Sequence, residues 1–262
     1  MPELPEVETI ARELHERLSG RTIAWISVFR ADVLRGASPQ ELASRCTGVR
    51  IDRVWRRGKT AIISLAQGWH LLIQPRFTGA VLVDDAPETT VISHDASHGS
   101  TTSAAITERS APDDSYSAIE WGLADGGRFW YRDVRRLGTV TLASDADLAD
   151  YDARMGDEPL DPRFTADRLS GLVRGSRAAI KKVLMDQRVL AGVGNIYANE
   201  GLWLAGIDPS REARSLGADE VGRLHHALVT TLAASIEARG TTFRDYRDPS
   251  NQAGGFAAQL RV

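Results

Sequence analysis

The sequence predicts an α+β protein in which an N-terminal antiparallel β-sandwich with a leading helix precedes a helical domain. Residues 4–20 place apolar side chains at helical spacing, and short strand-like runs with turn residues between them occupy much of 22–143. From Asp147 onward, apolar residues return to helical spacing. Strands followed by helices along one chain are typical of an α+β fold or of two separate domains.

The leading helix has signals at both ends. Pro5 suits the first turn, where a missing backbone N–H costs nothing. Glu3, Glu6 and Glu8 complement the positive end of the helix dipole. Gly20 is a typical residue just beyond a helix end.

The strand-like runs alternate with turn signals at Arg57–Gly58, Gln67–Gly68 and Asp125–Gly127. We expect strands at 22–29, 49–55, 60–66, 69–74, 79–83, 117–124, 128–132 and 138–143. The sequence contains no internal repeat. These runs predict a sandwich domain over residues 1–148.

An acidic segment, residues 84–117, interrupts the strands. It is rich in Ser, Thr, Ala and Asp, and it contains seven acidic residues but one basic residue, Arg109. Such a composition predicts a long mobile insertion. His94 and His98 have the spacing of a metal pair on a helix, but nothing else in the segment indicates a helix, so we expect no metal site.

The helical domain is expected over residues 149–262. Helical spacing occurs at 166–173, 177–186, 195–206 and 218–239. The stretch 151–162, rich in Gly, Pro and Asp, predicts the linker between the domains.

Composition excludes several classes of protein. The chain has 262 residues and a net charge of -3. Its only cysteine, Cys46, excludes an intramolecular disulfide and a zinc site with several cysteines. We expect no transmembrane helix and no signal peptide, and hence a cytoplasmic protein.

A basic run from Arg163 to Arg188 contains seven bases and two acids. Because most of the acidic excess lies in the segment 84–117, a basic patch on the rest of the chain is compatible with phosphate binding. A solvated helix face explains the same pattern, and composition alone leaves both interpretations open.

The opening residues, MPELPEVET, also have two interpretations. They fit a helix start. They also fit a catalytic N-terminus, because removal of Met1 before a small residue would leave Pro2 as a free secondary amine. Alone, the residues favour the helix start.

Four motifs occur in order: MPELPEVET, RRGK at 56–59, RDVRRLG at 132–138 and AGVGNIYANE at 191–200. Together they resemble the formamidopyrimidine-DNA glycosylase and endonuclease VIII family over almost the whole chain. The tail from Gly240 to Val262 is more similar to the formamidopyrimidine branch. The resemblance implies a β-sandwich, a helix–two-turns–helix domain, and a base-excision-repair DNA glycosylase with abasic-site lyase activity on oxidised or ring-opened purines.

The resemblance implies catalytic roles for Pro2, Glu3 and Lys59. A neutral amine at Pro2 would attack the sugar C1′ and form a Schiff base, and β- and δ-elimination would follow. Glu3 would act as the acid–base carboxylate. Lys59 would bind the phosphate beside the lesion. Glu6 and Glu200 match supporting glutamates of the family.

Asn195, after the glycines of GVGN, matches a phosphate-binding residue and is also a good helix N-cap. Phe77, Arg135 and Leu137 match the three side chains that fill the void left by a flipped nucleotide. The family commonly has methionine or another apolar residue at the first position and phenylalanine at the third. Val134 replaces a common proline, which is expected to loosen the loop.

Most of the family continues into a zinc-bearing β-hairpin with four cysteines, about where this sequence reaches Val262. We therefore expect no zinc, no other metal and no cofactor, and weaker DNA binding. The expected partner is damaged double-stranded DNA, with no membrane, for a monomer in the bacterial cytoplasm that associates with the nucleoid through DNA. Two alternatives stay open: a damaged- or abasic-DNA-binding protein with weak or no catalysis, and an endonuclease VIII-like enzyme for oxidised pyrimidines.

Overall fold

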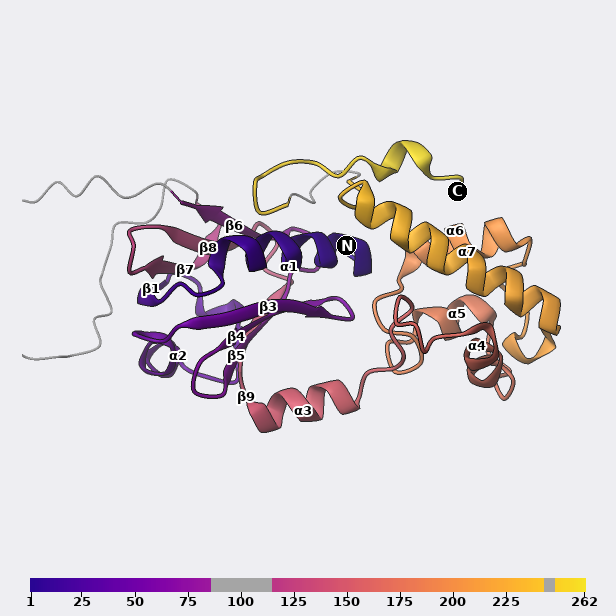
Figure 1. Ribbon diagram of the computed structural model, residues 1–262, viewed down its shortest axis with the longest axis horizontal. Helices are drawn as coiled ribbons and strands as arrows, with labels where there is room; N and C mark the ends of the chain where they lie inside the picture. Colours follow the sequence, from indigo (N-terminus) through magenta and orange to yellow (C-terminus); the bar gives the residue numbers. More distant parts are fainter. Residues whose placement is uncertain (86–114, 243–247) are drawn as a thin grey trace, which may run out of the picture.

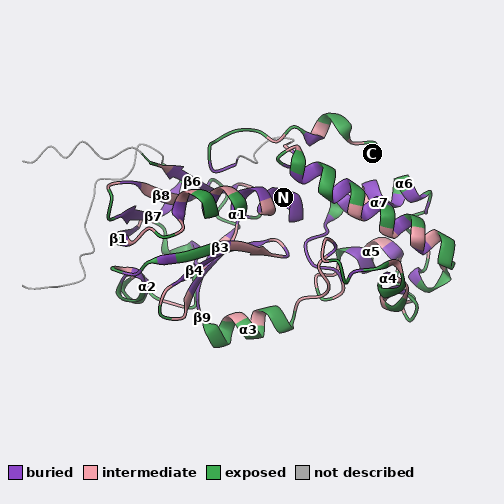
Figure 2. Cartoon of the chain, viewed as in Figure 1, coloured by how far each residue is buried: buried purple, intermediate pink, exposed green. Residues whose placement is uncertain are grey.

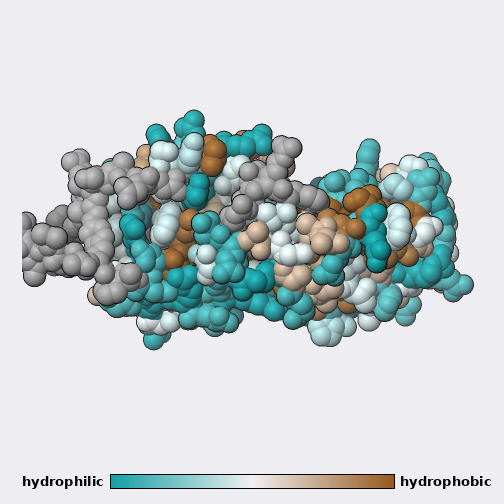
Figure 3. Space-filling view, turned by 90° about the horizontal axis from the view of Figure 1, so that it is seen from above, coloured by the Kyte–Doolittle hydropathy of each residue, from teal (hydrophilic) through white to brown (hydrophobic). Residues whose placement is uncertain are grey.

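The computed structural model describes residues 1–85, 115–242 and 248–262, and these form two lobes (Figure 1). A sandwich lobe at the left of Figure 1 and a helical lobe at the right are joined by the chain after β9, and the N-terminus lies between them. Most of the acidic segment, including His94 and His98, lies outside the described residues. In the view from above, a patch of hydrophobic side chains lies on the helical lobe with hydrophilic side chains around it (Figure 3).

Two sheets form the sandwich, in the orders β1-β7-β8-β6 and β2-β9-β5-β4-β3. All neighbouring strands are antiparallel except β2 and β9, which are parallel. The strands are β1 (Ile23–Val28), β2 (Leu34–Arg35), β3 (Ile51–Arg57), β4 (Thr60–Leu65), β5 (Trp69–Gln74), β6 (Gly79–Asp84), β7 (Ser117–Leu123), β8 (Arg128–Asp133) and β9 (Thr139–Ser144). The predicted α+β fold and its sandwich are confirmed.

The sandwich core combines apolar faces of both sheets with one face of α1 (Leu4–Leu18). Trp121 and Phe129 stack at its centre, with ring centroids 4.8 Å apart. The helix ends at Leu18, and Gly20 follows it with a φ of +84°, a conformation that glycine adopts without strain. The predicted leading helix is therefore confirmed.

The helical lobe has its own core, built mainly on α6 and α7. Its helices are α4 (Ala166–Val173), α5 (Ile180–Met185), α6 (Asn195–Ala205) and α7 (Ala218–Glu237). Leu4 of α1 is buried in this second core, whereas Val7 and Leu14 are buried in the first. The first helix therefore belongs to both lobes, and Figure 2 shows its N-terminal end buried where they meet.

Some elements were not expected. These are α2 (Pro39–Cys46), α3 (Asp145–Ala153) and the short 3₁₀ helices Ala31–Val33, Ala213–Ser215 and Phe256–Gln259. Because α3 continues to Ala153, it extends into the stretch predicted as linker. The domain boundary placed between residues 148 and 149 falls inside α3 and stays a prediction.

Candidate active site

The N-terminal end of α1 lies against the loop that begins α6. The backbone N–H of Leu4 donates to the carbonyl of Gly192 at 3.0 Å. The buried Glu3 carboxylate accepts the N–H of Gly194 at 2.7 Å and that of Ile196 at 3.0 Å. A carboxylate from the start of the chain thus occupies the positive end of α6, the place where helices favour anions.

This geometry corrects the prediction for Asn195. The N-cap of α6 is Gly194, and Asn195 is the first helical residue, with its side chain exposed. Because Glu3 occupies the amides of Gly194 and Ile196, those two donors are not available to a phosphate. Asn195 itself is exposed to solvent.

Lys59, in the turn between β3 and β4, lies beside Glu3. A Cβ added to Gly194 would lie 2.4 Å from the Glu3 carboxyl carbon and 2.5 Å from Lys59 Nζ. Burial lowers the pKa of Lys59, and the nearby Glu3 charge opposes that shift. Burial raises the pKa of Glu3, and the Lys59 charge opposes it. The structure brings these two predicted residues together.

Pro2 is buried at the same junction, with Met1 attached and exposed. Its nitrogen becomes a secondary amine when Met1 is removed. The chain thus brings the three side chains predicted to be catalytic to the junction of α1, α6 and the β3–β4 turn.

The buried Glu6 carboxylate accepts three hydrogen bonds next to this junction. Its carboxylate accepts the Glu3 N–H at 2.8 Å, the Tyr197 hydroxyl at 2.5 Å and the Thr241 N–H at 2.7 Å. Burial raises its pKa, although the Tyr197 hydrogen bond opposes the shift. Glu6 therefore ties the first turn of α1 to α6 and to the end of α7.

Glu200 lies elsewhere along α6. Its carboxylate accepts the N–H groups of Arg261 at 3.0 and 2.9 Å and of Val262 at 2.8 Å. Its described contacts hold the C-terminal residues against α6, so they give no positioning role toward Pro2 or Glu3.

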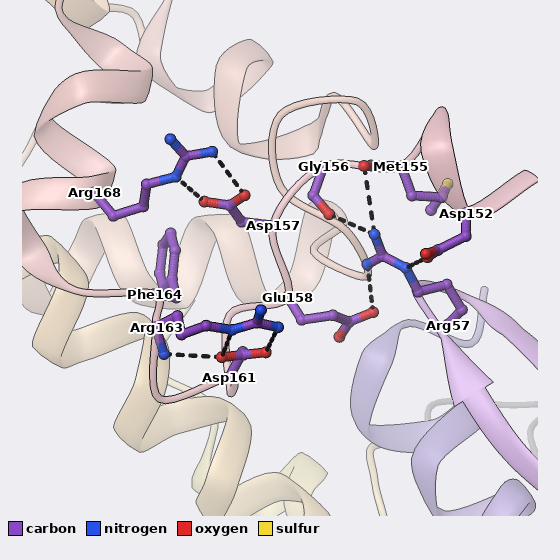
Figure 4. A pocket seen from close by; sticks show the side chains of 10 residues that line it. All are labelled: Arg57, Asp152, Met155, Gly156, Asp157, Glu158, Asp161, Arg163, Phe164 and Arg168. Atoms are coloured by element: carbon purple, nitrogen blue, oxygen red, sulfur yellow. Dashed lines mark hydrogen bonds and ion pairs between the residues drawn. The ribbon is translucent and has the colours of Figure 1, made fainter. Parts of the chain in front are cut away.

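The arginines before Lys59 connect the lobes. Arg57 donates to Asp152, Glu158 and the carbonyl of Gly156, and it lines a cavity of about 400 Å³ (Figure 4). Arg56 bridges Glu8 of α1 and Glu158, with N–O distances of 2.8 and 2.7 Å. These side chains fix the turn that carries Lys59.

Part of the predicted basic patch is neutralised locally. Arg163 pairs with Asp161, and Arg168 pairs with Asp157; both pairs line the cavity in Figure 4. Arg188 pairs with Asp186 at 2.8 Å. Because each of these three arginines is paired with a nearby aspartate, they fit a solvated helix face better than a phosphate-binding patch.

The three predicted void-filling residues lie on two adjacent loops. Phe77, between β5 and β6, is 46% exposed, and Leu137, between β8 and β9, is 42% exposed. The Arg135 guanidinium lies 5.4 Å from the centre of the Phe77 ring. Two apolar side chains are therefore presented to solvent, with the Arg135 cation over the ring of one of them, as intercalation between bases requires.

Sequence analysis missed several residues that shape the site. Gln187 donates its amide to the carbonyl of Val193 at 2.8 Å and accepts the Gly192 N–H at 2.9 Å, which fixes the GVGN loop. Asp133 holds the loops of the void-filling residues. An acidic residue inside the basic motif RDVRRLG was the only sequence signal for the latter.

Two kinds of feature are absent from the described ranges. No group of three or more His, Cys, Asp or Glu side chains there is placed to hold a metal ion. None of the helices in these ranges has the length and apolarity to span a membrane.

Comparisons with known proteins agree across the chain. Sequence models of the formamidopyrimidine-DNA glycosylase N-terminal domain and H2TH domain match residues 1–140 and 155–247. The formamidopyrimidine-DNA glycosylase of Chloroflexus aggregans is 37% identical over 262 residues, covering 100% of this chain and 87% of that protein. Its counterpart in Thermomicrobium roseum is 38% identical over 273 residues, covering 100% and 88%.

Solved structures give the same result. Lactococcus lactis Fpg in complex with DNA containing an abasic site has a TM-score of 0.82 and 29% identity, over 98% of this chain and 86% of that one. A mutant of the same protein with DNA containing Fapy-dG has a TM-score of 0.82 and 29% identity, over 99% and 87%. The Fpg (MutM) protein of Thermus thermophilus has a TM-score of 0.79 and 30% identity, over 99% and 86%.

Proposed function

The chain belongs to the formamidopyrimidine-DNA glycosylase family, and from this premise we propose that it is a DNA glycosylase and abasic-site lyase with Pro2 as nucleophile. The observation that carries the proposal is the junction of α1 and α6. In its support, the buried Glu3 carboxylate and the Lys59 ammonium both lie beside Gly194, and Glu3 directly follows the residue that removal of Met1 would make N-terminal.

The reaction begins with the amine. An α-amino group has a pKa of about 8, so a usable fraction is neutral at pH 7. As the Pro2 nitrogen bonds to C1′, the bond from C1′ to the damaged base breaks and the base leaves with a proton. Opening of the sugar ring then produces the iminium. Loss of a C2′ proton supplies the electron pair that expels the 3′ phosphate.

Glu3 supplies and removes protons in these steps. Its raised pKa keeps a larger protonated fraction than an exposed glutamate has at the same pH, which suits protonation of the ring oxygen. The ionised form can afterwards accept a proton during elimination.

Lys59 and Asn195 bind the phosphate beside the lesion. Within the described ranges the Lys59 ammonium makes no hydrogen bond or ion pair, so all its donors can turn toward a phosphate.

Phe77, Arg135 and Leu137 fill the gap in the duplex after flipping. The substrate is then double-stranded DNA with oxidised or ring-opened purines. The enzyme acts as a monomer in the bacterial cytoplasm and needs no metal or cofactor.

Borohydride trapping tests the proposal. We expect wild-type protein to form a covalent adduct with a duplex containing an abasic site, and Pro2→Gly to form at least about tenfold less, since a flexible primary amine replaces the constrained secondary one. An equal yield from Pro2→Gly would contradict the assignment of Pro2. Binding without any adduct from wild type would favour a DNA-binding protein that lacks turnover.

A lesion panel tests the substrate. Faster excision of ring-opened purines than of oxidised pyrimidines, from otherwise identical duplexes, is the expected result. The opposite order would indicate an endonuclease VIII-like preference.

A further inference from the structure

We propose that Asp133 is the positioning residue that holds Phe77, Arg135 and Leu137 together as one wedge, and that it governs insertion into the duplex rather than bond breaking. This inference rests on the proposed function, because it assumes that the three side chains enter DNA. The two loops that carry them come from different strand connections, β5–β6 and β8–β9. A contact between the two loops is therefore needed to keep the three side chains in one arrangement.

The Asp133 carboxylate makes that connection. Asp133 ends β8 and is 2% exposed. One of its oxygens accepts the Thr78 hydroxyl and, at 3.2 Å, the Arg135 N–H. The other accepts the Gly138 N–H at 2.8 Å and the Tyr131 hydroxyl at 3.2 Å. A single buried carboxylate thus accepts donors from both loops.

Thr78 completes the link. Its hydroxyl donates to Asp133 and accepts the Arg135 N–H at 3.0 Å. Thr78 follows Phe77 directly, and the Arg135 guanidinium lies over the Phe77 ring. The backbone bond and the ring contact together fix Phe77 and Arg135 relative to each other.

The backbone of both loops needs this support. Arg76 has a φ of +50° and Arg136 a φ of +52°, which is the left-handed conformation that non-glycine residues adopt only where their surroundings hold them. Arg76 precedes Phe77, and Arg136 lies between Arg135 and Leu137. Loss of the carboxylate would let both loops relax, and the wedge residues would move.

Close packing leaves the loops little room. A Cβ added to Gly138 would lie 2.0 Å from the Tyr131 hydroxyl, and one added to Gly79 would lie 2.4 Å from the same oxygen. Both glycines flank the wedge loops, so the hydroxyl that donates to Asp133 also sets how closely the loops approach.

The test separates insertion from chemistry. Insertion is followed by the fluorescence of 2-aminopurine placed opposite a tetrahydrofuran abasic analogue in duplex DNA. Chemistry is followed by borohydride trapping on a single-stranded oligonucleotide with an abasic site, which has no opposite base to displace. The variants are Asp133→Asn and Thr78→Val, with Thr78→Ser as the conservative variant that keeps the hydroxyl.

We expect Asp133→Asn to slow the fluorescence change about tenfold, because a charged acceptor of several hydrogen bonds is lost. Trapping on the single strand should stay at the wild-type level. Thr78→Val should show the same pattern more weakly, and Thr78→Ser should restore insertion. Asp32→Asn is the matched control, because the exposed Asp32 also contacts this loop, through Arg136 at 3.1 Å, yet it should change neither readout.

Two results would overturn the proposal: insertion at the wild-type rate in both Asp133→Asn and Thr78→Val, or an equal loss of insertion and of single-strand trapping. If Asp133→Asn does not fold, the two Thr78 variants decide the matter. Failure of the proposed function is distinguishable, because wild-type protein would then give no adduct on any substrate while the fluorescence measurement stays available.

Discussion

Glu3 and Lys59 are unusual because a buried carboxyl group and a half-buried ammonium group, both with shifted pKa values, lie beside the same glycine, Gly194. Burial disfavours the charged form of each, so the pKa of the carboxyl rises and that of the ammonium falls. The attraction between the two charges limits both shifts, and the amides of Gly194 and Ile196 further limit the rise in the pKa of Glu3. Groups with such shifts and with no structural ion pair are common in active sites.

The pKa of Lys59 predicts how DNA binding depends on pH. The ammonium exists only below a pKa that burial has lowered from 10.5, so its phosphate contact should be lost as pH rises toward that value. We expect the affinity of wild-type protein for an abasic-analogue duplex to weaken over an alkaline pH range that lies below the ordinary lysine pKa of 10.5, before an exposed lysine would titrate. Fluorescence anisotropy at constant ionic strength measures it.

Lys59→Arg provides the control, because its guanidinium stays charged over that range. The affinity of the Lys59→Arg variant for the same duplex should change less with pH than the affinity of wild-type protein. A parallel decline in the two proteins would show that another group titrates.

The resemblance indicated Pro2, Glu3 and Lys59, and the structure places all three at one junction. The contacts that explain their environment were not available from the sequence. Glu3 and Gly194 are 191 residues apart in the chain, and no local pattern reports which amides a carboxylate accepts. A separation of 55 residues likewise concealed the hydrogen bond from Thr78 to Asp133.

The start of α6 is the element on which the site depends. Gly192 has a φ of +88°, and Gly194 leaves room for Glu3 and Lys59. The resemblance implied a phosphate contact at Asn195 in this loop, whereas the structure shows that Gly194 admits the Glu3 carboxylate. The dipole of α6 thus stabilises the carboxylate that we propose as the acid–base group.

Gly194→Ala should therefore inactivate the enzyme. The new Cβ would lie within 2.5 Å of Glu3 and Lys59 atoms, so both side chains must move. A displacement of about 1 Å is enough to lower the rate of abasic-site cleavage by about 100-fold. Single-turnover kinetics measures the rate.

Gly222→Ala is the matched control for this change. A Cβ there meets nothing within 4 Å, and the residue lies inside α7. It should leave the rate unchanged and stabilise the protein by up to about 1 kcal/mol, because alanine favours helices. Wild-type activity in Gly194→Ala would refute the role assigned to this glycine.

The unexpected helices show why hydrophobic periodicity in the sequence does not reveal every helix. α2 begins with Ser38 as N-cap and Pro39 in its first turn, so its start signal was present and was overlooked. α3 has a cap at Ser144 but no buried residue, and Figure 2 shows it mostly exposed. A helix without an apolar face has no hydrophobic period to detect, whereas a strand such as β6, buried at its first five residues, is visible as an apolar run.

The molecule as a whole works only if its lobes keep their relative position. The site draws Pro2 and Glu3 from the residues just before α1, Lys59 from the sandwich and Asn195 from the helical lobe. Leu4 in the second core and the Glu8–Arg56–Glu158 bridge hold these parts together. Arg56 is only 8% exposed, so its ion pairs are screened little by solvent.

Arg56→Ala should destabilise the protein by about 2–4 kcal/mol at pH 7, because it removes the least exposed partner of two partly buried carboxylates and leaves each with one other arginine. Burial alone would raise the pKa of Glu8, but the hydrogen bond and charge of Arg56 hold it below its ordinary value of 4.5. This stabilisation is present above pH 4.5 and is lost as pH falls through the lowered pKa. The difference between variant and wild type should therefore shrink below pH 4.5 in urea unfolding.

Arg12→Ala gives the comparison at the same carboxylate. Arg12 also pairs with Glu8, at 2.7 Å, but its side chain is 60% exposed. Its loss should cost no more than about 0.5 kcal/mol. Equal effects of the two variants would argue against a bridge that holds the lobes.

The most direct test of the account locates the covalent bond to DNA. Borohydride-reduced adduct of wild-type protein is digested with trypsin and mapped by mass spectrometry. The predicted result is DNA attached to the nitrogen of Pro2 in the peptide Pro2–Arg12, with Met1 absent. Attachment to Lys59, Lys181 or Lys182, the only lysines of the chain, would contradict it.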